Sequence, residues 1–586
     1  MDHLLHEPHH DGSPLYLKQE TARLGDEVPI RVRTSEHDPV EAIWVRTVED
    51  GEPFFTSCTV DRVDGDAVWW AGHVHVRNPV QRYRFLVETE DGRVRWLNAA
   101  GVFDRDVTDA DDFRVSVYDA APDWGRDAIV YQIFPDRFAR SAAADTRPIP
   151  DWAVPAQWDD DPIHVGPHTP LQFYGGDLDG ITERLDHVTA LGFDTIYLTP
   201  VFPAESNHRY NASTFDEVDP LLGGDKAYRR LIDEAHTRGL RVLGDLTSNH
   251  TGDTHEWFLR ARADKRSKER RFYYFAPDGS YEGWKGYDTL PKLDHTSREL
   301  GSRFRAVVQR WLEFGIDGWR IDVANMTGRH AEVDIAHQVA REIRAAATEV
   351  RPDALVLAEH GHDATGDLDG DGWHGTMNYY GFSFPVWEWL RDPRREVPSF
   401  GLPVDVPRRG GVEAVTAMRA FTASFGWRSV SASWNILGSH DSPRIRTTTG
   451  SADLHHLAVV LQFTLPGVPM VFAGDELGFE GTDGEDSRRT MPWDSHESWE
   501  LRTAAVYARL AGLRRTHPAL RRGSLRWVRI GHDDIAFLRE HPRETLLVSV
   551  TRDGVTGELP GVTYVEQLYG VGNGRGPRAS IWRVEL

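Results

Sequence analysis

The stretch from residue 315 to 325 places an arginine and an aspartate two positions apart among apolar residues. Side chains alternate between the two faces of a strand, so Arg320 and Asp322 would point the same way. A neighbouring cation favours the ionised form of a carboxyl group, and an ionised, oriented aspartate at a strand end is suited to act as a nucleophile. Taken alone, the two residues fit a structural ion pair equally well.

Further polar residues stand where other apolar stretches end. Glu359 follows the apolar run 355–358, and Asp441 follows 434–437. Burial would raise the pKa of Glu359 and make it a proton donor, whereas Arg320 should lower the pKa of Asp322. Glycoside hydrolysis needs such a pair, one carboxylate that attacks and one acid that protonates the leaving oxygen. The other polar residues at these ends are Asp245, Asn249, His250, Arg320, His440 and, close behind, Arg444.

Two other hydrolytic chemistries fit these residues less well. Acyl transfer needs a Ser or Cys nucleophile with a histidine base. No Gly-x-Ser-x-Gly turn follows a predicted strand, and the lone cysteine, Cys58, lies in a separate region. Metal-assisted hydrolysis needs histidines at ligand spacing, and His208, His360 and His362 do not form a recognised set. The order of the acids along the chain therefore favours glycoside chemistry.

The elements that must position these residues alternate between strands and helices from about Asp127 onward. Eight strand–helix units predict a (β/α)8 TIM barrel, in which polar residues at the C-terminal strand ends line the site. An open doubly wound sheet is the alternative, but no Gly-rich phosphate loop follows the first strand. The predicted strands are 128–133, 195–199, 242–246, 318–323, 354–358, 376–380, 431–437 and 468–472. The predicted helices are 227–238, 303–314, 331–350, 412–425, 454–465 and 498–515.

The rest of the chain divides around this barrel. Residues 1–122 contain several short β-branched and aromatic runs separated by turns, which predicts an N-terminal β-sandwich. The catalytic barrel is assigned to 123–516. Its connection 247–297 is too long for a plain loop and predicts a small inserted subdomain after the third strand. Strand-like runs return in 517–586, which predicts a C-terminal all-β domain.

Composition narrows the classes of partner. The 586 residues carry a net charge of −24, which argues against nucleic acid and anionic membranes. No run of about 18 apolar residues occurs, and the N-terminus lacks the basic and apolar regions of a signal peptide. A single cysteine excludes an intramolecular disulfide and fits a reducing compartment, so we expect a cytoplasmic protein.

Four segments of the barrel resemble the four characteristic regions of the α-amylase family of retaining glycoside hydrolases. They occur in the family's order and are specific to it, and the resemblance covers about residues 125–515. The segments are Asp-Leu-Thr-Ser-Asn-His at 245–250, Gly-Trp-Arg-Ile-Asp-Val-Ala-Asn at 318–325, Ala-Glu-His at 358–360 and Gly-Ser-His-Asp at 438–441.

The resemblance implies a role for each matched residue. Asp322 would be the nucleophile, Glu359 the general acid/base, and Asp441 a third acid that binds sugar hydroxyls and stabilises the distorted transition state. Arg320 would orient the nucleophile, and Tyr210 would stack on the sugar in the −1 subsite. His250 and His440 would hydrogen-bond that sugar, and Asp245 and Asn249 would support the site structurally. We also expect His208, Asn325, Met326 and Arg444 among the substrate-binding residues.

Within the family, the chain resembles the neopullulanase, cyclomaltodextrinase and maltogenic amylase group. The matching stretches are 173–181, the Gly-Ser-His-Asp segment, and Leu-Pro-Lys-Leu-Asp at 290–294, which is similar to Met-Pro-Lys-Leu-Asn. An all-β domain before the barrel also fits. The resemblance implies a homodimer in which this domain packs over the partner's active site and narrows the cleft to short or cyclic malto-oligosaccharides.

Three positions depart from the group. Asp294 replaces an asparagine, and Met326 stands where the group usually has a glutamate, near the acceptor side of the cleft. The group's calcium loop is rich in Asn, Asp and Gly, but here Phe138 is followed by Ala-Arg-Ser-Ala-Ala-Ala. Calcium takes about six to eight oxygen ligands, which Asp177 alone cannot supply. We therefore expect no metal at that loop and no cofactor.

The sequence predicts retaining hydrolysis of α-1,4 bonds, with room for α-1,6 bonds, in short or cyclic malto-oligosaccharides. The intermediate would be a covalent glycosyl-aspartate. A glucanotransferase that uses the same intermediate with a sugar acceptor remains an alternative. A non-catalytic sugar-binding protein on the same barrel is a remote third hypothesis, because Asp322 and Glu359 are both present.

Overall fold

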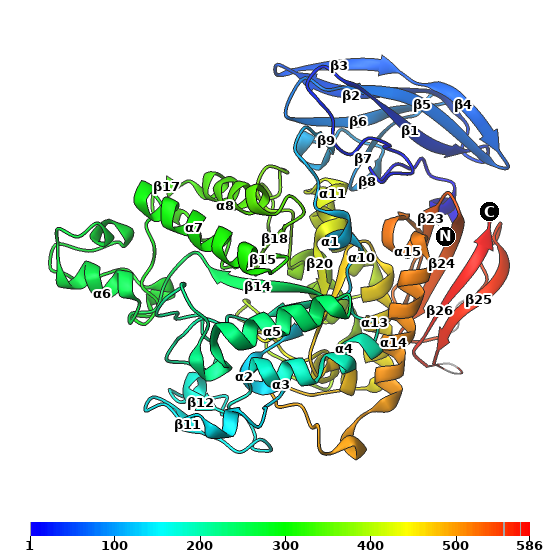
Figure 1. Ribbon diagram of the computed structural model, residues 1–586. Helices are drawn as coiled ribbons and strands as arrows, with labels where there is room; N and C mark the ends of the chain where they lie inside the picture. The colour runs from blue at the N-terminus through cyan, green and yellow to red at the C-terminus, as the bar shows by residue number, and fades with distance from the viewer. Residues whose placement is uncertain (1, 555–556, 573, 575) are drawn as a thin grey trace.

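The computed structural model describes residues 2–554, 557–572, 574 and 576–586. At its centre, parallel strands form one ring-like sheet with the order β19-β18-β15-β14-β13-β10-β21-β20 (Figure 1). A parallel bridge between Met377 and Trp434 joins the two ends and closes the barrel. The strands are β10 (Val130–Ile133), β13 (Thr195–Leu198), β14 (Arg241–Thr247), β15 (Gly318–Asp322), β18 (Leu355–Ala358), β19 (Gly375–Thr376), β20 (Trp434–Ile436) and β21 (Val468–Phe472). The predicted (β/α)8 fold is confirmed.

Helices cover the outside of this barrel, and their ends follow local sequence signals. The Ser297 hydroxyl caps α7 by accepting from Leu300 N, the helix buries Phe304 and Trp311 on one face, and it ends at Gly315 with φ 125°. The longer helices are α5 (Gly224–Thr237), α7 (Arg298–Phe314), α8 (Ala336–Val350), α10 (Gly411–Ala423), α13 (Ala452–Thr464) and α14 (Leu501–Thr516). Shorter ones are α1 (Asp123–Asp127), α2 (Pro135–Phe138), α3 (Leu178–Glu183), α4 (Leu185–Ala190), α9 (Phe384–Leu390), α11 (Trp427–Ala432), α12 (Ile445–Thr449) and α15 (Pro518–Arg522).

Two strand predictions were too long. The sixth strand ends at Thr376, and Tyr379–Ser383 forms a π-helical turn after Asn378, whose side chain accepts from Gly381 N. The first residues of the seventh predicted strand belong to α11, and only Trp434–Ile436 pair in the sheet. Fully buried apolar runs have the same pattern as strand or as helix, so their composition did not separate the two.

A subdomain follows β14, as the length of that connection predicted. It contains α6 (Glu256–Ala263) and packs an aromatic cluster of Phe258, Tyr273, Phe275 and Tyr281. Two contacts fasten it to the end of β14: Leu293 N donates to Asn249 O at 2.9 Å, and Lys292 Nζ donates to Asn249 Oδ1 at 2.6 Å. The subdomain is therefore fixed to the end of β14, the strand that carries Asp245 and leads into His250.

An N-terminal sandwich lies beside the barrel, in blue in Figure 1. Its two sheets enclose an apolar core that includes Ile30, Val45 and Phe85. One sheet contains β1 (Glu27–Ser35), β5 (Ala67–His75) and β4 (Thr59–Asp64). The other contains β3 (Glu52–Ser57), β2 (Val40–Glu49), β6 (Val80–Thr89), β7 (Val94–Asn98), β8 (Gly101–Phe103) and β9 (Phe113–Ser116). The sequence patterns did not reveal β3 and β4, because every residue in both is exposed and none shows a buried face.

The C-terminal domain is one antiparallel sheet packed against α13 and α15 (Figure 1, red). Its order is β22 (Ser524–Ile530), β23 (Asp534–His541), β24 (Glu544–Thr551), β26 (Arg578–Glu585) and β25 (Thr563–Val571). In the part of the chain that the structure describes, no helix has both the length and the apolar character needed to cross a membrane.

Candidate active site

Three acids meet at the C-terminal mouth of the barrel around one arginine. Asp322 is the last residue of β15, Glu359 follows β18, and both side chains are largely buried, with residues 6% and 9% exposed. Arg320 Nη1 donates to Asp322 Oδ1 at 2.8 Å, and Arg320 Nη2 lies 2.9 Å from Glu359 Oε2. Neighbouring parallel strands thus place the two acids on the two arms of one guanidinium.

Each of these acids keeps one oxygen without a hydrogen bond to any described residue. Glu359 Oε2 also accepts from Val323 N at 2.8 Å, which leaves Oε1 available to carry a proton. Asp322 Oδ2 lies 3.9 Å from His250 Nε2, and that nitrogen has no hydrogen-bond partner. Val323, directly after Asp322, has φ 45°, a strained conformation for a β-branched residue. The backbone therefore departs from strand geometry at the point where the two acids meet.

Asp245, near the end of the third barrel strand, binds Arg320 and holds its guanidinium in place. Its two carboxylate oxygens accept from Arg320 Nη1 at 2.8 and 2.9 Å, and Oδ2 also accepts from the hydroxyls of Tyr197 at 2.6 Å and Tyr210 at 2.9 Å. All of these donors come from the protein, and Asp245 is 2% exposed. This placement supports the structural role expected of Asp245.

A second hydrogen-bonded chain fixes His440. Gln132, on β10, donates from Nε2 to His440 Nδ1 at 2.8 Å, so the ring proton is on Nε2. His440 Nε2 lies 2.8 Å from the Tyr210 hydroxyl and 3.1 Å from Asp441 Oδ2. The rings of Tyr210 and His440 stack at 5.5 Å with an interplanar angle of 9°. Sequence reasoning missed Gln132, although a lone polar residue within the apolar run 129–134 was the signal that marked it.

Asp441 has a partner that the sequence did not suggest. Arg488 Nη2 donates to Asp441 Oδ1 at 3.1 Å, and Arg488 Nε donates to His440 O at 2.8 Å. Arg488 lies in a loop after the last barrel strand, so its position along the chain gave no signal.

Arg444, which we expected to bind substrate, is corrected by the structure. Its guanidinium is fully buried, pairs with Asp475 Oδ1 at 2.8 Å and donates to Ser487 O at 2.6 Å. A side chain whose donors are directed at buried protein oxygens cannot also reach a sugar in the cleft. Arg444 supports the loop that carries Arg488.

The remaining expected residues surround the same mouth. His208 Nδ1 accepts from Tyr210 N at 3.1 Å, and its ring stacks on Tyr210. Asn249 Nδ2 lies 3.3 Å from His250 Nδ1.

The loop beyond β15 carries two further expected residues. Asn325 Nδ2 lies 2.9 Å from His362 Nε2, and the Met326 carbonyl accepts from Lys292 Nζ at 3.1 Å. Trp284, from the subdomain, brings its indole to 5.8 Å from the His250 ring and was not among the predicted residues.

The charges at this mouth shift several pKa values. Burial raises the pKa of Asp322 well above the usual range, Arg320 opposes the rise, and Glu359, Asp245 and Asp441 add to it. Arg320 thus lowers the pKa of Asp322, as expected, but burial and the neighbouring acids outweigh it, so the net shift is upward. Burial lowers the pKa of His250 to about 3, so this imidazole is neutral at ordinary pH.

The loop after β10, where the family resemblance places a calcium ion, offers a poor donor set for one. Asp177 is fully buried, and its oxygens accept from Arg147 Nη1 at 2.7 Å, Ser141 Oγ at 2.7 Å, Ser141 N at 3.0 Å and Gly180 N at 2.8 Å. The guanidinium of Arg147 already supplies the positive charge that a cation would bring. Among the described residues, no group of three or more His, Cys, Asp or Glu side chains is arranged to hold a metal.

Comparison with known proteins agrees with this geometry. The family described as "Alpha amylase, catalytic domain" matches residues 132–513. Two curated relatives are a cyclomaltodextrinase of a Bacillus species and neopullulanase 2 of Thermoactinomyces vulgaris. The first is 32% identical over 446 residues, covering 74% of this chain and 74% of the relative. The second is 33% identical over 418 residues, covering 69% and 65%.

Two solved structures are also similar. The ligand-free cyclic α-maltosyl-(1→6)-maltose hydrolase of Arthrobacter globiformis is 32% identical, with a TM-score of 0.65 over 74% of this chain and 93% of that one. The type III pullulan hydrolase of Thermococcus kodakarensis is 25% identical, with a TM-score of 0.71 over 99% of this chain and 100% of the other. The similarity therefore extends beyond the barrel to the flanking β-domains.

Proposed function

The chain belongs to the alpha-amylase family, and on this premise we propose that it hydrolyses α-glucosidic bonds in short or cyclic malto-oligosaccharides with retention of configuration. It is a glycoside hydrolase of the cyclomaltodextrinase and neopullulanase type. One observation carries the proposed mechanism. Arg320 holds Asp322 and Glu359 by one oxygen each, at 2.8 and 2.9 Å, and leaves the second oxygen of each acid open.

In the first step, Asp322 Oδ2 attacks the anomeric carbon while Glu359 Oε1 gives its proton to the glycosidic oxygen. The bond from the anomeric carbon to that oxygen breaks, and a covalent glucosyl ester of Asp322 forms. Arg320 keeps Oδ1 of the same carboxylate engaged, so the attacking atom is defined. General acid catalysis requires that Glu359 carry the donated proton and that Asp322 be ionised in the reacting state.

In the second step, water replaces the leaving sugar. Glu359, now ionised, removes a proton from this water as it attacks the anomeric carbon, and the ester bond to Asp322 breaks. Two inversions give net retention. We propose that Asp441, His250 and His440 hydrogen-bond the sugar hydroxyls and that the Tyr210 ring stacks on the sugar. The unpartnered His250 Nε2, 3.9 Å from Asp322 Oδ2, supports this for His250.

The substrate range follows from the relatives. One is named a cyclomaltodextrinase, and another hydrolyses cyclic α-maltosyl-(1→6)-maltose, a ring that contains α-1,6 bonds. We include α-1,6 bonds in the proposal on this basis, with Met326 and Asn325 on the loop that would face the acceptor sugar.

Product analysis tests this proposal. The enzyme is incubated with cyclodextrins, cyclic maltosyl-maltose, pullulan, starch and maltotriose, and the anomeric form of the first products is followed by NMR. We expect α-anomers and preference for the short and cyclic substrates. Initial β-anomers would refute the retaining mechanism, and products longer than the substrate at low concentration would favour the glucanotransferase.

The assembly is also part of the proposal, as a homodimer formed through the N-terminal sandwich. The edge strands β3 and β4, one in each sheet of the sandwich, expose Phe54 and Phe55, 50% and 49% exposed, together with Val60 and Val63. Exposed apolar side chains on edge strands favour association. Light scattering of Phe54→Ser/Phe55→Ser should give a monomer, while Val165→Ser, an exposed valine elsewhere, should leave the dimer intact. A monomeric wild-type protein would contradict the assignment.

We further propose that the loop after β10 functions without calcium. The four donors to Asp177, including Arg147, support this. Stoichiometric calcium in the purified protein at this loop would overturn it.

A cytoplasmic location completes the proposal. It is supported by the single cysteine, Cys58, which is buried in the sandwich core. Fractionation of the producing cells, with the protein found outside the cytoplasmic fraction, would contradict it.

A further inference from the structure

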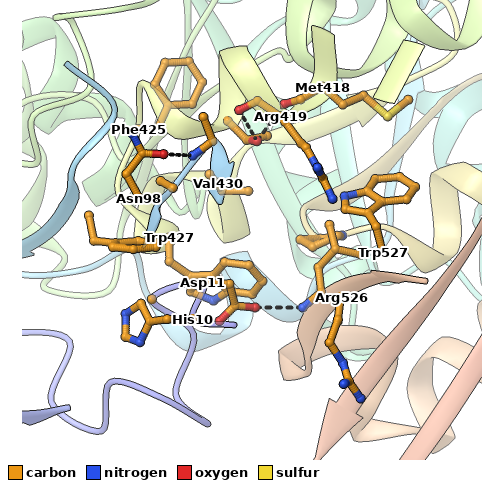
Figure 2. A pocket seen from close by; sticks show the side chains of 18 of the residues that line it. His10, Asp11, Asn98, Met418, Arg419, Phe425, Trp427, Val430, Arg526 and Trp527 are labelled. Carbon is orange, nitrogen blue, oxygen red and sulfur yellow. Dashed lines mark hydrogen bonds between the residues drawn. The ribbon is translucent and has the colours of Figure 1, made fainter. Parts of the chain in front are cut away.

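A second cavity lies at the junction of the N-terminal sandwich, the barrel and the C-terminal sheet, away from the catalytic mouth. Its volume is about 150 Å³, and it is enclosed by the N-terminal segment 4–12, the β7–β8 hairpin, helices α10 and α11 and strand β22 (Figure 2). None of the proposed catalytic residues lines it. The cavity is therefore a feature separate from the site described above.

Aromatic side chains from different domains form much of its wall. Trp427 comes from α11, Trp527 from β22, and Phe425 from the turn between α10 and α11. Trp527 is 6% exposed and is held by an edge contact with Phe537 at 5.3 Å. Rigid aromatic faces of this kind pack against apolar C–H surfaces of a ligand.

Polar groups with unused hydrogen-bonding capacity face the same space. Arg419, on α10, extends toward the indole of Trp527 in Figure 2. The Glu7 carboxylate, also on the pocket wall, attracts its guanidinium, but the five N–H donors of an arginine exceed what one carboxylate can accept. His9 Nε2 is buried and has no partner in the described part of the chain. A buried polar atom without a partner is costly unless something else satisfies it. These groups point to a ligand.

Acceptors and a further donor complete the lining. The Asp11 carboxylate accepts from Ser13 N at 2.9 Å and from Leu525 N at 2.8 Å, which leaves lone pairs on both oxygens. Asn98 Oδ1 accepts from Ala100 N at 3.0 Å, so its amide NH2 remains as a donor. The pocket thus offers donors and acceptors together, and its wall carries charges of both signs, from Glu7 and Asp11 and from Arg114, Arg419 and Arg526. Because these charges offset one another, a neutral polar ligand fits the wall better than a strongly charged one.

The volume of the cavity then limits which neutral ligand with several hydroxyl groups can fit. A water needs roughly 15 Å³ of such volume, so the cavity accommodates about ten water-sized groups. A hexose ring has about a dozen non-hydrogen atoms, apolar C–H faces and hydroxyls that both donate and accept.

We propose that this junction pocket binds one hexose unit, as free glucose or as one residue of maltose, between Trp527 and the polar groups of Arg419, His9 and Asn98. The choice of glucose rests on the proposed function, since glucose and maltose are products of that reaction, while the pocket itself does not depend on it. A sugar bound here contacts the sandwich, the barrel and the C-terminal sheet at once. It therefore stabilises their arrangement by mass action.

Crossed variants separate this pocket from the active site. Asp441→Asn weakens sugar binding at the catalytic mouth, and Arg419→Met removes the donors in the junction pocket while keeping the length of the side chain. Glucose is titrated by calorimetry into the full-length protein carrying Asp441→Asn, with and without Arg419→Met. We expect one binding event per chain in the first protein and at least about tenfold weaker binding in the second. Arg419→Met alone should retain the wild-type turnover number on cyclodextrin.

Several outcomes would overturn the assignment. They are the absence of glucose binding in the Asp441→Asn protein, equal binding with and without Arg419→Met, or an Arg419-dependent response to inorganic phosphate in place of glucose. If Arg419→Met fails to fold, Arg419→Lys and Trp527→Phe replace it, and each should weaken glucose binding while the unliganded melting temperature stays near that of the parent. No glucose binding by the Asp441→Asn protein, together with normal cyclodextrin hydrolysis by the wild type, would reject the pocket and leave the proposed function intact.

Discussion

The catalytic mouth and the loop around Asp177 are built from the same groups, buried carboxylates and an arginine, yet they satisfy them differently. At the mouth, Arg320 is shared by Asp245, Asp322 and Glu359, and two acid oxygens remain without a hydrogen bond to a described residue. At the loop, Arg147 serves Asp177, and backbone and hydroxyl donors fill the other positions of that carboxylate. We call this group, Ser141, Arg147, Asp177 and Gly180, the Asp177 cradle.

The pairing of a buried carboxylate with an arginine can therefore support catalysis in one place and stability in another. A carboxylate whose lone pairs are all engaged has a fixed charge and no atom free to attack or to transfer a proton. A carboxylate held by one oxygen keeps the other for reaction, and burial beside other acids raises the pKa of Asp322 although Arg320 opposes the rise. Variants in the two regions should therefore affect different quantities, turnover at the mouth and stability at the cradle.

The largest expected effect is on turnover at the mouth. Asp322→Asn should lower kcat by about 10⁴-fold or more, because the attacking oxygen is replaced by a weak nucleophile. Glu359→Gln should lose comparable activity on cyclodextrins but recover on α-glucosyl fluoride, whose leaving group needs no proton. Steady-state kinetics with both substrates measure this.

The matched control is Asp363→Asn, an exposed carboxylate in the loop after β18. It should change kcat less than about threefold. A mild loss in Asp322→Asn, or recovery of that variant on the fluoride, would remove Asp322 as nucleophile.

The next effect is on stability in the cradle. Arg147→Met should lower the free energy of unfolding by about 3–5 kcal/mol, because it leaves the buried Asp177 carboxylate without its counter-charge. The kcat of the folded variant should stay within about threefold of wild type. Urea unfolding and kinetics on the same preparations give both quantities.

Arg140→Met is the control in the same segment, since Arg140 pairs with an exposed Asp145. That pair should contribute less than about 1 kcal/mol. A stability loss in Arg147→Met no larger than this would show that the cradle does not depend on its arginine.

A smaller effect is expected on the free energy of unfolding at acidic pH. The pKa of His250 is lowered to about 3 in the folded state, from 6.5 for an unburied imidazole, because of burial. As the pH falls through this window, the unfolded chain binds a proton that the folded chain does not, so stability is lost. His250→Gln should therefore lose less stability than wild type between pH 7 and 4, by roughly 3 kcal/mol.

Unfolding curves at the two pH values measure this difference. The exposed His532→Gln serves as control and should follow the wild type. Identical acid sensitivity in His250→Gln and wild type would refute the assignment.

The smallest expected effect is that of chelation. If Arg147 takes the place of a cation, EDTA and added calcium should each leave the melting temperature and kcat of the wild type unchanged. In Arg147→Asn, the loop loses its internal cation, and added calcium should then raise the melting temperature. A fall in wild-type melting temperature on chelation, reversed by calcium, would contradict the cradle.

Sequence patterns predicted helices and strands best where the element has a consistently buried face. The barrel strands and the α7 helix followed from apolar runs and spacing, whereas β3 and β4 have no buried face and gave no pattern. For the site, the motifs identified Asp322, Glu359 and Asp441 as candidates, because acids at strand ends share one mouth in a barrel. Arg444 satisfied the same motif reasoning, yet it binds Asp475 inside the protein.

The sequence by itself determined which groups could react, since their types and order along the chain are written in it. Only the tertiary structure decided which oxygen of each acid is free, that Gln132 and Arg488 hold His440 and Asp441, and that Arg147 neutralises Asp177. These partners lie tens to hundreds of positions apart in the chain. Hydrogen bonds and ion pairs act over a few ångströms in space, so spacing along the chain cannot reveal them until the fold has brought the groups together.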